Sequence, residues 1–195
     1  GLGVYLFSIH HTAQETTAYL LKRGLLLMAL ELFPLSFFYW GIVPQPTLWM
    51  QVIWCIGLCM IILAALRHLP RPALIGLGLA LVCLHNLLDP IRLTPDDSLF
   101  PLWAMLHQRD TFPLAFGLVA KTTYPILPWV GVILLGFGIG PWFRGDVPAD
   151  VRQRRLLILG FGMIAAFIAL RLLNLYGDKP WFVVEGDPVR TLIGF

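Results

Sequence analysis

Long apolar runs, separated by polar connections, dominate the chain. Five of them approach the roughly 20 residues that a helix needs to cross a hydrocarbon core about 30 Å thick. They cover residues 24–40, 48–66, 72–88, 122–143 and 156–176. This pattern predicts an all-α fold, a polytopic transmembrane helix bundle with about five spanning helices. The apolar opening predicts part of a sixth helix, so we expect a single domain over residues 1–195 that is truncated at both ends.

One connection is much longer than the others. Residues 89–121 hold several prolines together with acidic residues, including the adjacent Asp96 and Asp97. Proline and paired acids argue against a membrane span, and a loop of this length is often functional. We therefore expect residues 89–121 to form a functional loop and not another spanning helix.

The basic residues predict an orientation. If Lys22 and Arg23 lie in the cytoplasm and the helices alternate, most of the basic residues fall on the cytoplasmic side. Loops that stay in the cytoplasm carry an excess of Lys and Arg. The same alternation places residues 89–121 and the C-terminal segment outside.

Composition agrees with lipid as the main partner. The chain is 58% hydrophobic and 13% charged, about half the charge of an ordinary soluble domain. This excludes the soluble enzyme classes. The net charge of +3 is small and forms no basic stripe, so nucleic acid is not expected as a partner. The three cysteines lie in apolar runs without metal-ligand spacing, which predicts buried thiols and no metal site.

Ionisable side chains inside the apolar runs are the first candidates for chemistry, because a charge at the bilayer centre costs at least about 2.5 kcal/mol. Glu31 lies within the first run, and His85, Asn86 and Asp89 lie at the end of the third. His85 and Asp89 are four residues apart. If the helix continues that far, they share a face, and the carboxylate would orient the imidazole.

A second group lies at the end of the fifth run, where Arg171 and Asn174 precede Asp178. We predict that residues from these helices converge near one membrane face. The expected catalytic residues are His85, Asp89 and Glu31, and the expected substrate-binding residues are Arg171, Asn174, Asn86, His107 and Asp178. The alternative is a neutralising network that locks the helices together, with His107 as a solvated or capping histidine of the loop.

Five strings in register carry a family resemblance. They are LLKRGL at residues 20–25 with Glu31 following, WCIGL at 54–58, HNLLD at 85–89, YPILPWVGV at 124–132 and RLLNLYGD at 171–178. In this order they resemble the bacterial branch of the heparan-α-glucosaminide N-acetyltransferase catalytic-domain family, which is similar to other transmembrane acyltransferases. The resemblance extends over nearly the whole chain.

The resemblance implies a multi-pass acyltransferase of the bacterial cytoplasmic membrane. Such a protein moves an acetyl group from cytoplasmic acetyl-CoA to a sugar or glycan acceptor on the far side. The family's catalytic histidine belongs to a motif expected upstream of this chain, so it is not assigned to any position here. Arg67 and Arg71 are expected to attract the CoA phosphates, although the excess of basic residues in cytoplasmic loops explains them without a ligand. A homodimer is left open.

Two other classes of protein fit the same polar cluster. A transporter or channel-like protein would use it as a substrate or proton path, and a membrane scaffold would use it only for assembly. A transporter more often shows repeated halves or paired broken helices. The sequence shows neither feature, so acyl transfer is the leading hypothesis, with a histidine as general base or acyl carrier.

Overall fold

The computed structural model describes residues 1–39, 46–173, 184–187 and 189–190. The chain divides into two compact units, Gly1–Pro141 and Trp142–Phe195. The predicted runs that end at Trp40 and Tyr176 therefore finish outside the described residues. Each unit is considered by itself.

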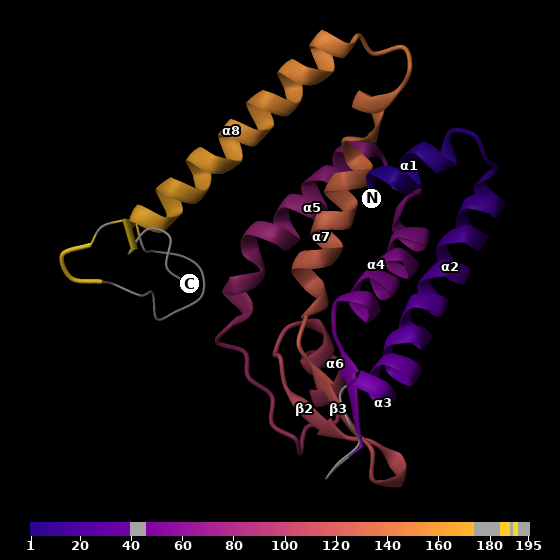
Figure 1. Ribbon diagram of the computed structural model, residues 1–195, viewed down its shortest axis with the longest axis vertical. Helices are drawn as coiled ribbons and strands as arrows, with labels where there is room; N and C mark the ends of the chain where they lie inside the picture. Colours follow the sequence, from indigo (N-terminus) through magenta and orange to yellow (C-terminus); the bar gives the residue numbers. More distant parts are fainter. Residues whose placement is uncertain (40–45, 174–183, 188, 191–195) are drawn as a thin grey trace. The chain divides into compact units, whose positions relative to one another are not determined.

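The first unit is built on two helix pairs. Helix α2 (Ala13–Leu30) packs along α4 (Val52–Leu66), and α5 (Arg71–Leu84) packs along α7 (Ile126–Gly138). Contacts between α4 and α7 join the pairs, so the four helices lie side by side (Figure 1). The short α1 (Leu2–Ser8) packs on α7.

Helix α2 begins earlier than predicted. Thr12 accepts a hydrogen bond from the Glu15 backbone N–H, and the Glu15 side chain accepts one from the Thr12 backbone N–H. This capping box starts the helix at Ala13, so α2 begins before the predicted apolar run, which starts at Gly24. The far end widens into a π-helical turn, Glu31–Leu35, around Pro34, and continues as α3 (Ser36–Tyr39).

A small sheet lies at one end of the helices, and the prediction of helices alone is wrong there. Its strands are β1 (Thr47–Met50), β2 (Thr111–Pro113) and β3 (Val119–Thr122) in the order β1-β3-β2. β1 is parallel to β3, with Trp49 opposite Lys121, and β2 is antiparallel to β3. A short apolar strand cannot be separated from helix by hydrophobicity alone, so the predicted run over residues 48–66 absorbed most of β1. β2 and most of β3 fall in the segment predicted as a loop.

The segment predicted as a loop is folded. Between Asp89 and Lys121 the chain forms α6 (Phe100–Leu106), β2, the short 3₁₀ turn Ala115–Gly117 and most of β3. Phe100 of α6 and Phe112 of β2 are buried edge to face, with ring centroids 6.5 Å apart. Helix α6 and the sheet therefore form a packed cap at the end of the bundle where α5 finishes (Figure 1).

Glycines close both helix pairs. A Cβ at Gly57 would lie 2.6 Å from the Gly24 carbonyl oxygen, and one at Gly131 would lie 2.7 Å from the Gly78 carbonyl oxygen. No side chain fits at such distances. Small residues at these positions let the backbones approach, as they do where membrane helices pack closely.

The second unit is dominated by α8 (Ala149–Leu173), a 25-residue helix none of whose residues is buried. At its start the guanidinium of Arg152 lies 5.9 Å from the centre of the Phe143 ring, and that of Arg155 lies 5.9 Å from the centre of Trp142. These contacts gather positive charge and aromatic rings where the apolar helix begins.

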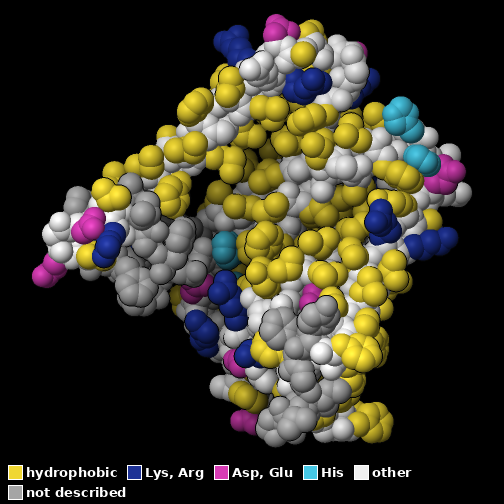
Figure 2. Space-filling model, viewed as in Figure 1, with side chains coloured by type: hydrophobic (Ala, Val, Ile, Leu, Met, Phe, Trp, Pro, Cys, Tyr) yellow, Lys and Arg dark blue, Asp and Glu magenta, His cyan; other side chains and the backbone are white. Residues whose placement is uncertain are grey.

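Two of the described helical segments, Arg71–Leu88 and Ala149–Leu173, are long and apolar enough to cross a membrane by length and composition. Val52–Leu66 and Ile126–Gly138 are apolar but shorter. Hydrophobic side chains cover much of the visible helix surface of the first unit (Figure 2). The structure is thus mostly helical as predicted, while the number of five spans stays a prediction.

Candidate functional site

The turn that ends α5 brings the first polar groups together. Helix α5 stops at Leu84, and His85–Leu88 continue as a 3₁₀ helix before Asp89 and Pro90. With three residues per turn, positions three apart face each other, and Asn86 donates from Nδ2 to Asp89 Oδ2 at 3.2 Å. The predicted His85–Asp89 pair is therefore wrong, because it required an α-helix through Asp89, in which residues four apart share a face.

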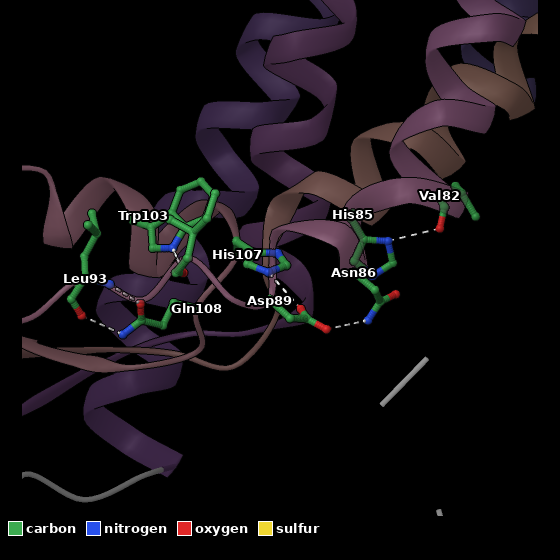
Figure 3. A network of polar contacts seen from close by, with 9 residues as sticks. Val82, His85, Asn86, Asp89, Leu93, Trp103, His107 and Gln108 are labelled. Carbon is green, nitrogen blue, oxygen red and sulfur yellow. Dashed lines mark hydrogen bonds and ion pairs between the residues drawn. The ribbon is translucent and has the colours of Figure 1, made fainter. Parts of the chain in front are cut away.

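The partner of Asp89 is His107, which caps the C-terminal end of α6. Its Nε2 lies 2.9 Å from Asp89 Oδ1 (Figure 3). The His107 side chain is 7% exposed, whereas that of Asp89 is 45% exposed. Each carboxylate oxygen thus has one donor from a side chain, and the group still faces solvent.

Side chains at the C-terminal end of α6 contact every second residue of the segment that begins at Asp89, namely Asp89, Ile91 and Leu93. Besides the His107–Asp89 contact, Trp103 Nε1 donates to the Ile91 carbonyl oxygen at 2.9 Å. Gln108 accepts from the Leu93 N–H at 2.9 Å and donates back to the Leu93 carbonyl at 3.0 Å. These three side chains fix the path of the chain leaving Asp89 (Figure 3).

His85 lies beside this network with its tautomer set by the backbone. Its Nδ1 is 3.0 Å from the Val82 carbonyl oxygen. A carbonyl oxygen only accepts, so Nδ1 must carry the hydrogen, and in the neutral ring Nε2 keeps a lone pair. The ring centroids of His85 and His107 are 6.3 Å apart.

Glu31 belongs to a different network. It is buried in the π turn, and its Oε2 accepts from the backbone N–H groups of Ile53 at 2.7 Å and Trp54 at 3.0 Å. These are orphan donors of the first turn of α4, so Glu31 caps that helix. Ser36 extends the link, donating to the Glu31 carbonyl oxygen and accepting from the Trp49 N–H. The geometry favours the helix-locking alternative for this residue.

The two arginines expected to bind CoA phosphates donate hydrogen bonds to the ends of other helices. Arg67 donates to the Ala13 carbonyl oxygen and, at 2.8 Å, to Thr17 Oγ1 at the start of α2. Arg71 donates from Nε to the Gly138 carbonyl oxygen at 2.7 Å, at the C-terminal end of α7. Their predicted part in phosphate binding stays a prediction.

Three predicted site residues belong to the far end of the chain. Arg171 is in the last turn of α8, in the second unit, while Asn174 and Asp178 lie outside the described residues. Convergence of these three with the α5 turn stays a prediction. Among the described residues, no group of three or more His, Cys, Asp or Glu side chains is placed to hold a metal ion.

A hollow lies between α4 and α7, with a volume of about 400 Å³. Apolar side chains, two glycines and the thiols of Cys55 and Cys59 line most of it, with Tyr124 and Trp129 where the two helices begin. Its lining contains no carboxylate, imidazole or basic side chain. Acid–base chemistry in the first unit is therefore better supported at the α5 turn.

Sequence reasoning missed Trp103 and Gln108. It listed His107 as a substrate-binding residue, with a solvated or capping histidine of the loop as the alternative, and the structure places it as the C-cap of α6. One signal was available, because Trp103 lies within the apolar string FPLWAML and His107, four residues later, directly follows that string. That spacing is typical of one face of a short helix. The spacing does not indicate that these side chains contact residues 89–93.

This arrangement can bind and deprotonate a polar acceptor. An exposed carboxylate attracts an ammonium group or accepts a hydrogen bond from a hydroxyl, and a neutral imidazole nitrogen can take up the proton released when that group attacks. Asp89 is the exposed carboxylate of this arrangement, and His85 is an imidazole of the same turn. Both come from one turn.

Comparison with known proteins gives the family. The family model described as heparan-alpha-glucosaminide N-acetyltransferase, catalytic, matches residues 2–176. No curated protein and no solved structure matches the chain. The matched range includes α5, the turn at Asp89 and the α6 cap. The chain therefore belongs to the heparan-alpha-glucosaminide N-acetyltransferase catalytic family.

Proposed function

We propose that the protein is an integral membrane acyltransferase that moves an acetyl group from acetyl-CoA to a sugar or glycan acceptor. The observation that carries this proposal is the exposed Asp89 carboxylate, held by His107 and Asn86 at the turn that also carries His85, in a chain of an acetyltransferase family. The proposed location is the bacterial cytoplasmic membrane, with several spanning helices and the α5 turn facing outward.

The chemistry assigns separate roles to the two side chains. A hydroxyl or amine of the acceptor attacks the carbonyl carbon of the thioester, forming a C–O or C–N bond while the C–S bond breaks. His85 Nε2 takes the proton that the acceptor loses, and the CoA thiolate leaves with the electron pair. Asp89 holds the acceptor so that its nucleophilic atom faces the thioester. These roles rest on this chain's geometry and leave the family's own histidine unassigned.

The donor side of the proposal lies at the other end of α5. Arg71 begins this helix and Asp89 follows its end, and 14 helical residues span about 21 Å. CoA phosphates near Arg67 and Arg71 would thus lie across the bundle from the acceptor. This separation suits a reaction that passes an acetyl group from one side of a membrane to the other.

The test uses the full-length protein in sealed membrane vesicles with acetyl-labelled acetyl-CoA on the side of Arg71 and a panel of amino sugars and glycans on the other. We expect the label to move to an acceptor with the wild type and the loss of that transfer with His85→Gln. His68→Gln is the matched control, because His68 is an exposed histidine of the α4–α5 connection.

Two results would contradict the proposal. If His85→Gln transferred acetyl as well as the wild type does, the assignment of His85 as the general base would be contradicted. If the folded, correctly oriented wild type transferred no more label than empty vesicles, the proposal of an acyltransferase would be contradicted. The transporter alternative would then be tested by measuring flux of the same solutes across the membrane.

A further inference from the structure

The His107 side chain is largely buried, with 7% of it exposed, and it has an unusual set of contacts. Nε2 is bonded to Asp89, whereas Nδ1 is buried and has no hydrogen-bond partner among the described residues. The Trp103 and His85 rings lie against it, with centroids 5.3 Å and 6.3 Å from its own. A buried nitrogen without a partner is uncommon and calls for an explanation.

We propose that His107 is a positioning residue that fixes the Asp89 carboxylate for the acceptor. This inference rests on the proposed acyl transfer and adds a residue whose direct contact with substrate the burial argues against. The expectation that His107 binds substrate itself is replaced by a role through Asp89.

The contacts determine which form of the ring can play this part. A carboxylate oxygen accepts, so Nε2 must donate its hydrogen to Asp89 Oδ1. A second hydrogen on Nδ1 would be buried without an acceptor, at a cost in free energy. Neutral His107, with its hydrogen on Nε2, keeps the donor to Asp89 and leaves only a lone pair on Nδ1, so no buried N–H lacks an acceptor. The titratable groups that face it are Asp89 and His85.

The consequence is a carboxylate held from two sides and open on the third. His107 fixes Oδ1 and Asn86 fixes Oδ2, so rotation of the Asp89 side chain is restricted while nearly half of it stays exposed. Acyl transfer depends on a nucleophile placed within a narrow range of distance and angle. Loss of the His107 N–H should therefore affect turnover more than folding.

Three substitutions separate hydrogen bonding from packing. In His107→Gln the amide nitrogen reaches about the place of Nε2 and keeps a donor, whereas His107→Phe keeps a ring and loses the donor. His107→Ala loses both. We expect kcat for labelled acetyl transfer in vesicles to fall about 10- to 100-fold in the Phe and Ala variants and to be largely restored in the Gln variant. KM for the donor acetyl-CoA should not change, because Asp89 acts on the acceptor. His68→Phe is the control.

A readout independent of activity keeps the two proposals apart. Hydrogen exchange at residues 89–93, measured by mass spectrometry on the full protein, should accelerate in His107→Phe and return toward wild type in His107→Gln. If that pattern appears but the wild type transfers no acetyl group, the positioning stands and the proposed function fails. If the wild type transfers acetyl and His107→Phe does so equally well, the positioning role is overturned.

Discussion

The two helix pairs of the first unit are built alike and end differently. Gly24 and Gly57 bring α2 against α4, and Gly78 and Gly131 bring α5 against α7. Each pair then carries a carboxylate where one helix gives way to an irregular turn, Glu31 in a π turn and Asp89 after a 3₁₀ turn. Similar helix packing therefore supports two acids with different environments.

What differs is the nature of the donors. Glu31 is 4% exposed, and one of its oxygens is shared between two backbone N–H groups of α4. Asp89 is held by the side chains of Asn86 and His107 and stays exposed. A buried carboxylate that caps a helix has a structural role, whereas a carboxylate that accepts hydrogen bonds only from side chains at a turn stays accessible to a ligand. An acid within an apolar run is thus not catalytic by position alone.

The largest expected effect on stability comes from Glu31. Glu31→Ala leaves the N–H groups of Ile53 and Trp54 without their acceptor in a buried place, which should lower the free energy of unfolding by about 2–4 kcal/mol. Thermal unfolding in detergent, followed by size-exclusion chromatography, measures the loss. Glu31→Gln retains an acceptor oxygen and should lose less. Equal stability of Glu31→Ala and wild type would contradict the capping role.

The glycine contacts give a smaller effect that tests the likeness of the two pairs. A methyl group at Gly57 or Gly131 would meet backbone oxygen, so Gly57→Ala and Gly131→Ala should each destabilise by about 1–3 kcal/mol. Gly76 of α5 has open space around it, and Gly76→Ala should be neutral or slightly stabilising. If one pair tolerates alanine and the other does not, the likeness fails.

The smallest effect concerns a third carboxylate, Glu15, in the first turn of α2 and outside the predicted span. The Thr12 backbone N–H, followed by the Thr12 hydroxyl, lowers the pKa of this exposed group. Because the folded pKa is depressed, the stabilisation is present above the unfolded value of about 4.3 and is lost as the pH falls through the folded value. The thermal midpoint of the wild type should therefore drop more between about pH 5 and pH 3 than that of Glu15→Gln. Parallel curves would contradict this.

Local patterns predicted the parts that depend on local sequence. The apolar runs located α4, α5, α7 and α8, and the string HNLLD placed His85, Asn86 and Asp89 at a helix end. Family membership followed from several strings in register and is confirmed by the match over residues 2–176.

The remainder depends on contacts between distant residues. β1 is paired with β3 across more than 60 residues, so nothing near Thr47 could reveal a strand partner. Glu31 meets Ile53, 22 positions away, and the Asp89–His107 contact requires α6 to fold back on the α5 turn. His85 is not the partner of Asp89 because the turn between them is a 3₁₀ helix, in which residues three apart share a face. His107 takes its place as the partner.

The most direct test compares the two carboxylates in one assay. Asp89→Asn and Glu31→Gln, in the full-length protein in sealed vesicles with labelled acetyl-CoA, are compared by transfer per folded molecule. We predict that Asp89→Asn keeps the thermal midpoint of the wild type and loses transfer by about 100-fold or more, the range of a lost acid–base or positioning group. Glu31→Gln should lower the midpoint and transfer normally per folded molecule. Normal transfer by Asp89→Asn, with loss in Glu31→Gln, would place the chemistry at the other helix pair and contradict the account.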